Sequence, residues 1–545
     1  MCLSLRPLYK IFKEKILTMP RVLVSDPIAP EGIAILKKVA DVDVKTGLPK
    51  EELASIIGEY DALAVRSETK VTAEILAAAK NLKIIGRAGV GVDNIDVAVA
   101  TERGILVVNS PEGNTIAAAE LTVAMLLALA RNIPQADASL RGGEWKRSKY
   151  VGAEVYGKTL AVIGLGKIGR EVASRLQAFK MNVIGYDPFL KADQAEALGI
   201  RLVDLDTLYQ EADYITVHVP KTKDTAGMIS TDQIAKMKPT VRLINVARGG
   251  IIDEAALAAA AKEGRIGGAA IDVFSTEPAP ADNPLLGIPN IITTPHLGAS
   301  TEEAQVNVAI DIAEQIADVL AGKPARSAVN MPSVSAEVLA RIEPYLWLAE
   351  RIGSLHSQLT STGVQSVEII YSGDFGDLPT LHITRAVMKG ILQTIVPDSV
   401  NYVNAPTLAN ARGIQVTESH RSAQGDHNCL LTVVAKTGGS SGREICGSVF
   451  SRNDIRIVHI DGFRVNVTPT GWMIVTKHTD RPGIIGRVGT LLGDSGTNIA
   501  GMHVGREGEG KDAIMVLKID NAVSEDLLEQ MRTIPGMEAA RQVQL

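Results

Sequence analysis

Three polar residues occupy or directly follow the ends of predicted strands: Arg248 in LINVARGG, Glu277 in DVFSTEP and His296 in TTPHLGAST. A guanidinium offers two parallel N–H donors that match a carboxylate. A histidine exchanges protons near neutral pH, and a carboxylate on its other ring nitrogen fixes its tautomer. These residue types predict oxidation of a 2-hydroxy acid: Arg248 holds the substrate carboxylate, His296 takes the hydroxyl proton and Glu277 orients His296.

Each of these residues, taken alone, also has a plain structural explanation. A histidine after a proline commonly belongs to a turn, and an arginine at a strand end is commonly solvated. Ligands of open α/β sheets bind beyond the carboxyl ends of the strands, so a common position there favours one shared crevice. Asp272, in the predicted strand AAIDVF, could orient the nicotinamide side of that crevice.

The segment GLGKIG, residues 164–169, predicts a dinucleotide site, because the apolar segment LAVI precedes it and a helical pattern follows. Gly164 permits a tight turn, Gly166 the approach of a pyrophosphate and Gly169 the packing of helix on strand. Asp187 ends the next predicted strand. A carboxylate there accepts hydrogen bonds from ribose hydroxyls and repels a 2′-phosphate, so the expected cofactor is NAD rather than NADP.

Two alternations of predicted strands and helices must position these residues. The first begins at RVLVSD, residues 21–26, and the second at KTLAVIGLGKIGREVASRL, residues 158–176. After His296, a long helical pattern has the register to return to the first unit. The predicted fold class is α/β: two doubly wound Rossmann-like domains, the nucleotide domain inserted in the substrate domain, then a mixed α/β intervening domain and a βαββαβ domain. The expected boundaries are 19–115 with 297–330, 116–296, 331–468 and 471–545.

Composition limits the class of protein. The chain has 545 residues and a net charge of -6, which suits a globular protein of several domains and gives no reason to expect nucleic acid. The longest apolar stretch, 116–130, contains Glu120 and is too short for a membrane span. The three cysteines form no metal-ligand pattern, so we expect a reducing, cytoplasmic location without structural zinc or a disulfide framework.

Residues 1–18 form an N-terminal extension with two interpretations. Its basic residues are scattered and its apolar run is too broken for a secretory signal. A disordered extension, or an upstream start codon with the true start at Met19, is preferred. A transit peptide is the alternative, although such peptides usually carry more serine.

Four segments, in this order, resemble the motifs of the D-2-hydroxyacid dehydrogenases over roughly residues 20–330: GLGKIG with Asp187, NVARGG, DVFSTEP and PHLGAST. The resemblance implies two Rossmann-like domains and assigns Arg248, Glu277 and His296 to the active site. It also implies cofactor contacts from Val90, Lys167, Ile168, Val246, Ala247, Arg248, His296, Leu297, Gly298 and Ala299.

Within that family, three segments look like those of the long-form D-3-phosphoglycerate dehydrogenases: AVRSETKV, GRAGVGVDNID and NSPEGNTIAAAEL. The resemblance implies 3-phosphoglycerate as substrate and 3-phosphooxypyruvate as product, on the route to L-serine. Two arginines and small donors suit a phosphate dianion. The implied substrate contacts are Arg66, Ser67, Arg87 and Asn114, together with Arg248 and His296.

The basic segment GEWKRSKY, residues 143–150, resembles a loop that reaches a neighbouring subunit. Arg147 or Lys149 would then add to the phosphate site; the alternative is a solvated basic turn. Together with the helix at 116–130 and the C-terminal segment, this loop suggests a homo-oligomer, either a dimer or a tetramer.

Residues 478–506, HTDRPGIIGRVGTLLGDSGTNIAGMHVGR, resemble the ACT domain, an amino-acid-binding module. The implied effector is L-serine, with His478, Asp480 and Asn498 as contacts. Asp480 departs from the amide found in some members, and an ACT domain kept only for assembly is the alternative. The intervening domain binds an anion in some members, and the basic residues that could do so here, or simply be solvated, are Arg452, Arg456 and Arg464.

Two other functions remain alternatives. A related dehydrogenase of glycerate or glyoxylate would leave either Arg66 or Arg87 without an anion to bind. A dehydrogenase-fold protein that senses NAD and binds partners, as some transcriptional corepressors do, would not need the complete set of Arg248, Glu277 and His296.

Overall fold

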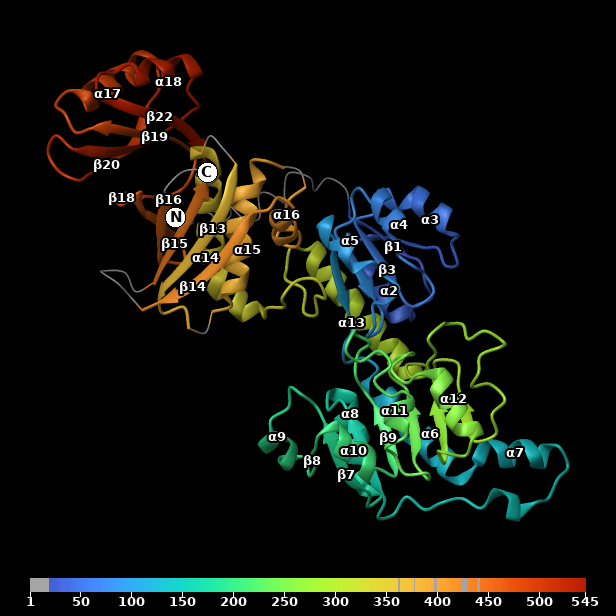
Figure 1. Ribbon diagram of the computed structural model, residues 1–545. Helices are drawn as coiled ribbons and strands as arrows, with labels where there is room; N and C mark the ends of the chain where they lie inside the picture. Colours follow the sequence, from blue (N-terminus) through green and yellow to red (C-terminus); the bar gives the residue numbers. More distant parts are fainter. Residues whose placement is uncertain (1–18, 361–362, 377, 397–398, 423–428, 439–441) are drawn as a thin grey trace.

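The computed structural model describes residues 19–545 apart from 361–362, 377, 397–398, 423–428 and 439–441, and it contains four sheets in succession (Figure 1). Residues 1–18, with both interpretations given to them, lie outside the described part of the chain. Among the described residues, no single helix has the length and apolar composition to cross a membrane. Helices α6 (Thr115–Arg131) and α7 (Ile133–Arg141) have that length and composition only when taken together, as a pair bent by 63°.

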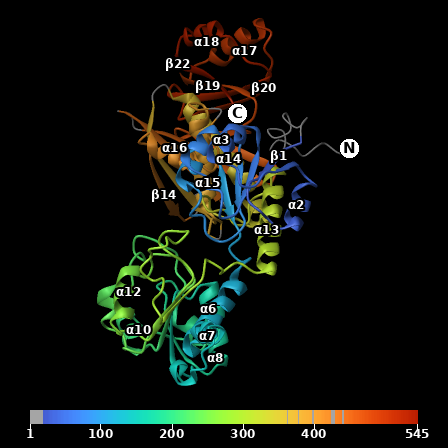
Figure 2. The same cartoon turned by 90° about the vertical axis from the view of Figure 1, so that its right-hand side faces the viewer.

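Five parallel strands form the first sheet, in the order β2-β1-β3-β4-β5. Helix α13 (Glu302–Leu320) returns to this sheet after the second unit, as Figure 2 shows. Gly86 permits the contact, since a Cβ there would lie 2.6 Å from Ile312. The other elements are β1 (Arg21–Val24), α2 (Pro30–Leu36), β2 (Asp41–Val44), α3 (Lys50–Ile56), η1 (Ile57–Glu59), β3 (Ala62–Val65), α4 (Ala73–Ala78), β4 (Ile84–Arg87), α5 (Val97–Glu102) and β5 (Leu106–Asn109).

Seven parallel strands form the second sheet, in the order β12-β11-β10-β9-β6-β7-β8. The strand order reverses at β6, and at such a point the carboxyl ends of the strands open a crevice for a nucleotide. Besides α6 and α7, its elements are η2 (Arg147–Tyr150), β6 (Thr159–Ile163), α8 (Lys167–Ala178), β7 (Asn182–Tyr186), α9 (Ala192–Ala197), β8 (Arg201–Leu202), α10 (Leu205–Glu211), β9 (Tyr214–Val217), α11 (Thr231–Ile234), β10 (Arg242–Asn245), α12 (Glu254–Lys262), β11 (Gly268–Ile271) and β12 (Ile291–Thr293).

The third sheet is mixed, in the order β14-β13-β15-β16-β17-β18, and only its β13–β14 pair is parallel. Helices α14 and α15 cross closely at Gly353 and Gly390, because glycine has no Cβ. A Cβ at either position would collide with the backbone of the other helix. The elements are α14 (Ala336–Leu359), β13 (Val364–Gly373), α15 (Thr380–Gln393), α16 (Ala405–Ala411), β14 (Gln415–Arg421), β15 (Cys429–Thr437), β16 (Arg443–Ser451), β17 (Asp454–Ile460) and β18 (Phe463–Val467).

The fourth sheet is antiparallel, in the order β20-β21-β19-β22, with two helices packed against it. Its elements are β19 (Trp472–Thr479), α17 (Ile484–Asp494), β20 (Ile499–Arg506), β21 (Asp512–Ile519), α18 (Glu525–Arg532) and β22 (Met537–Gln544). This succession is the expected βαββαβ pattern. The predicted fold class is therefore confirmed: two parallel α/β units, a mixed α/β unit and a small βαββαβ unit.

Candidate active site

His296 and Glu277 form a hydrogen-bonded pair beyond the carboxyl ends of β11 and β12. The backbone of His296 has a φ of 55°, a left-handed conformation that is uncommon for a residue with a side chain. Its Nδ1 lies 2.7 Å from Oε2 of Glu277. The other oxygen, Oε1, accepts a hydrogen bond from the Phe274 N–H at 3.0 Å. The pair is thus held from both sides, and Nε2 of His296 is the ring nitrogen left for a substrate hydroxyl.

The carboxyl of Glu277 is ionised at neutral pH. Partial burial would raise its pKa, but the hydrogen bonds from His296 and the Phe274 N–H, with the charge of Arg248, hold the pKa below its ordinary value. An ionised carboxylate keeps a proton on Nδ1 and stabilises the imidazolium that forms when Nε2 takes a second proton. The pair has the arrangement of a general base and its orienting group.

Asp272 holds the turn that carries His296. Its side chain is fully buried and accepts hydrogen bonds from Thr294 Oγ1 at 2.6 Å, from the Leu297 N–H at 2.7 Å and from the Gly298 N–H at 2.9 Å. The backbone carbonyl of Asp272 also accepts from the His296 N–H at 2.8 Å. Its contacts therefore hold the turn, and its predicted role beside the nicotinamide stays a prediction.

Arg248 projects from the segment after β10 toward the first unit. Its Nη1 donates to the Ala247 carbonyl at 2.7 Å, and its Nε donates to Oδ2 of Asp93 at 3.1 Å. The Asn245 side chain fixes the local backbone by donating to the Arg248 carbonyl at 2.9 Å. A Cβ on Gly91 would collide with the guanidinium, so this glycine allows Arg248 to lie against the first unit.

Arg66 and Arg87 stand at the carboxyl ends of neighbouring strands, since Val65 pairs with Arg87 in the β3–β4 register. Burial, together with the charges of Arg248 and Arg66, lowers the pKa of Arg87 to about 10. Nε of Arg87 is buried and has no hydrogen-bond partner within the described residues. The guanidiniums of Arg66 and Arg248 therefore lie near that of Arg87, and the exposed Ser67 is next to Arg66 in sequence.

Buried polar atoms without partners also surround the start of α6. They include Oδ1 of Asn114, which the sequence had indicated, and the hydroxyl oxygens of Ser110 and Thr115, which it had not. An unpaired buried polar group is costly, so such a cluster fits a polar ligand. The signal for the missed pair was present in the motif NSPEGNT, whose polar residues follow strand β5 directly.

The glycines of residues 164–169 have the geometry of a dinucleotide site. Gly164 has a φ of 91°, and a Cβ there would lie 2.6 Å from the His218 carbonyl oxygen. A Cβ on Gly169 would collide with the Gly164 carbonyl, whereas Gly166 faces open space at the N-terminus of α8. Open space beside exposed backbone N–H groups suits a pyrophosphate, so the residues present fit NAD.

Asp187 lies beside this glycine turn. Its Oδ2 accepts from the Leu165 N–H at 2.8 Å and its Oδ1 from the Phe189 N–H at 2.9 Å. Each carboxylate oxygen accepts more than one hydrogen bond, so the carboxylate keeps capacity for ribose hydroxyls. Lys167 is exposed and forms an ion pair with Glu112, and Ile168 packs against the core behind the turn.

The remaining cofactor candidates come from both units. The Val90 carbonyl accepts from Asn109 Nδ2 at 2.6 Å, which fixes the loop after β4. A Cβ on Gly298 would lie 3.2 Å from Val246 Cγ1, so the segments after β10 and β12 are in contact. Val246 is buried, and the other three candidates on these segments are Ala247, Leu297 and Ala299.

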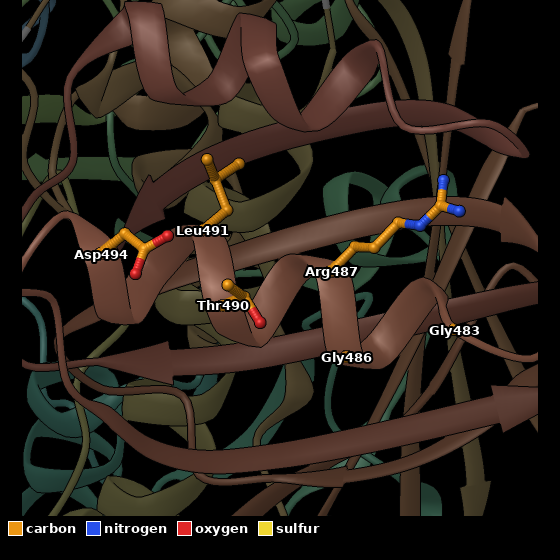
Figure 3. A pocket seen from close by; sticks show the side chains of 6 residues that line it. All are labelled: Gly483, Gly486, Arg487, Thr490, Leu491 and Asp494. Carbon is orange, nitrogen blue, oxygen red and sulfur yellow. The ribbon is translucent and has the colours of Figure 1, made fainter.

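The candidate effector residues each have a partner inside the chain. His478 is buried, and its Nδ1 lies 3.3 Å from Thr476 Oγ1. Arg506 donates to Asp480 at 3.1 Å, and Asn498 donates to Asp520 at 2.8 Å. None of the three lines the open hollow on the outer face of α17, which Figure 3 shows. In the intervening unit, Arg452 pairs with Glu343 and Arg456 with Asp454.

Three family models match the chain: the NAD binding domain of D-isomer specific 2-hydroxyacid dehydrogenases at 123–298, the D-3-phosphoglycerate dehydrogenase intervening domain at 341–461 and the ACT domain at 472–536. A D-3-phosphoglycerate dehydrogenase of Synechocystis is 50% identical over 97% of this chain and 95% of its own length. One of Archaeoglobus fulgidus is 47% identical over 96% of this chain and 100% of its own length. The solved D-lactate dehydrogenase of Aquifex aeolicus, complexed with NAD and lactic acid, is 29% identical with a TM-score of 0.52, and covers 57% of this chain and 100% of its own.

Proposed function

This chain belongs to the D-3-phosphoglycerate dehydrogenases, within the D-isomer specific 2-hydroxyacid dehydrogenase family, and we propose that it oxidises 3-phospho-D-glycerate to 3-phosphooxypyruvate with NAD. This would be the first step of L-serine formation from 3-phosphoglycerate. The proposed catalytic residues are Arg248, Glu277 and His296.

The residues divide the reaction among them. Nε2 of His296 takes the proton of the C2 hydroxyl, and Glu277 stabilises the resulting imidazolium. Arg248 holds the substrate carboxylate and so fixes C2 in front of the cofactor. Residues 164–169 and Asp187 would hold NAD, which would supply the acceptor for the hydride that leaves C2.

One observation carries the choice of substrate: Arg66 and Arg248 lie near Arg87, and the half-buried Arg87 has no counter-ion in hydrogen-bond contact among the described residues. A carboxylate alone would leave two guanidiniums unpaired. A substrate with a carboxylate at one end and a phosphate at the other supplies an anion to both ends of the cluster. The glycerate- or glyoxylate-type alternative lacks the second anion.

Replacing Arg66 with glutamine should lower kcat/KM for 3-phosphooxypyruvate by about 30-fold, because a charge-assisted hydrogen bond to phosphate is lost. For unphosphorylated hydroxypyruvate, the same variant should change kcat/KM by less than about threefold, since that substrate leaves the phosphate end empty. Steady-state oxidation of NADH measures both. Arg326→Gln, which breaks an exposed pair with Glu314, is the matched control. Equal losses on both substrates would favour the unphosphorylated alternative.

Turnover of neither substrate, with NADH binding intact, would favour the NAD-sensing alternative. The same assay tests that function on the wild-type protein before any variant is made. The complete arrangement of His296, Glu277 and Arg248 argues against a sensor, because binding of NAD alone needs neither a base nor a carboxylate fork.

The ACT domain supplies a regulatory site for L-serine in this proposal, formed between paired copies and including Asp480 and Asn498. L-Serine at millimolar concentration should suppress NADH oxidation by the wild type and not by Asn498→Ala. Asn498 is exposed, so its loss should leave the rate without serine unchanged. A wild-type rate indifferent to serine would reduce the ACT domain to a role in assembly.

The protein is a homo-oligomer, a dimer or a tetramer, in this proposal. Large apolar side chains are exposed around the loop after α7: Trp145 and Val151 are each 78% exposed and Tyr156 is 72% exposed. Exposure of three large apolar side chains along one loop supports an interaction surface. In such an assembly, Arg147 or Lys149 would reach the phosphate site of a neighbour. Cysteine usage favours the cytoplasm.

A further inference from the structure

The loop after β4 presents Asp93 to Arg248 from a fixed backbone. The Ala88 N–H donates to the Val65 carbonyl at 2.8 Å, and the Ser110 N–H donates to the Gly89 carbonyl at 2.9 Å. Asn109 holds the next carbonyl, that of Val90. The side chain of Asp93 is nevertheless 75% exposed, so it can change position without any change in this backbone.

Asp93 occupies part of the guanidinium of Arg248 that a substrate carboxylate requires. Nη1 is directed to the Ala247 carbonyl, and Nε donates to Asp93 Oδ2. A bidentate carboxylate needs two adjacent N–H groups, and the edge formed by Nε and Nη2 is the one not directed at the backbone carbonyl. A substrate carboxylate that binds this edge therefore competes with Asp93 for Nε.

The other acidic groups that face this cationic cluster are committed elsewhere. Asp26 is 1% exposed and accepts from the backbone N–H groups of Arg66 and Thr69. Glu277 is held by His296 and the Phe274 N–H. Among the described residues around the cluster, Asp93 is the carboxylate with the exposure needed to leave.

We propose that Asp93 is a specificity-determining residue, a resident carboxylate that binds Arg248 and is exchanged for the carboxylate of the substrate. An ion pair with so exposed a carboxylate contributes little to stability, so the exchange is readily reversed. A substrate that also binds Arg66 and Arg87 has the additional attraction to displace Asp93. A small anion that reaches only Arg248 has no such support and is disfavoured.

The test compares Asp93→Asn with the wild type and with Glu74→Gln, which breaks an exposed surface pair with Lys50. Calorimetry measures oxalate binding to the NADH-loaded enzyme, and steady-state kinetics measure kcat and KM for 3-phosphooxypyruvate. In Asp93→Asn, oxalate should bind about fivefold more tightly and KM should fall, while kcat stays within about twofold. Glu74→Gln and Asp93→Glu should both match the wild type.

Unchanged or weaker oxalate binding in Asp93→Asn would overturn the inference, because it would make Asp93 either irrelevant to Arg248 or an aid to its orientation. A fall in kcat with unchanged KM would overturn it as well. The inference rests on the proposed role of Arg248, and the two failures are distinguishable. A wild type that does not reduce 3-phosphooxypyruvate sinks the substrate assignment, while oxalate binding still decides the role of Asp93.

Discussion

The His296→Asn variant should reduce 3-phosphooxypyruvate about 10³-fold more slowly than the wild type at pH 7, because no other group replaces Nε2 as the proton donor. Asparagine keeps a polar side chain of similar reach but does not exchange protons near neutral pH. Oxidation of NADH under saturating substrate measures the loss in kcat. Affinity for NADH, followed by its fluorescence, should stay within about threefold of the wild type.

His503→Asn is the matched control, because His503 is exposed on β20, in the ACT domain. Its kcat without serine should equal that of the wild type. A loss of less than about tenfold in His296→Asn would contradict the assignment of His296 as the acid and base, since positioned proton transfer contributes about 10²–10⁴-fold.

Replacement of Arg248 by lysine should lower kcat/KM by about 10²-fold for phosphorylated and unphosphorylated 2-oxo acids alike. Lysine keeps the charge but loses the planar fork that binds both carboxylate oxygens. It also loses the hydrogen bond to the Ala247 carbonyl that orients the side chain. Two lost charge-assisted hydrogen bonds account for about 3 kcal/mol, which corresponds to about 10²-fold.

Arg248→Lys and Arg66→Gln should differ, because only Arg248 is proposed to bind the carboxylate that every 2-oxo acid carries. Arg242→Lys, at the other end of strand β10, is the control and should leave kcat/KM unchanged. A loss in Arg248→Lys that is confined to the phosphorylated substrate would place Arg248 at the phosphate instead, and would contradict the assigned orientation of the substrate.

The amino-acid sequence alone determined the fold class and the pairing of the proposed catalytic groups. Apolar segments of parallel strands are recognisable by their composition, and their carboxyl ends meet at one edge of the sheet. A polar residue that directly follows such a segment therefore has a predictable position. This reasoning placed Glu277 and His296 beside each other, and the structure confirms that pair at 2.7 Å.

The tertiary structure alone decided which partners the remaining charged groups take. Asp272 binds the turn of His296 because the segments after β11 and β12 are adjacent, and His478 is buried because of its place in the fourth sheet. The pair of Arg248 and Asp93 joins residues 155 positions apart in two different units. Sequence periodicity describes one element and its own sheet, whereas a contact across a cleft depends on how two separately folded units lie against each other.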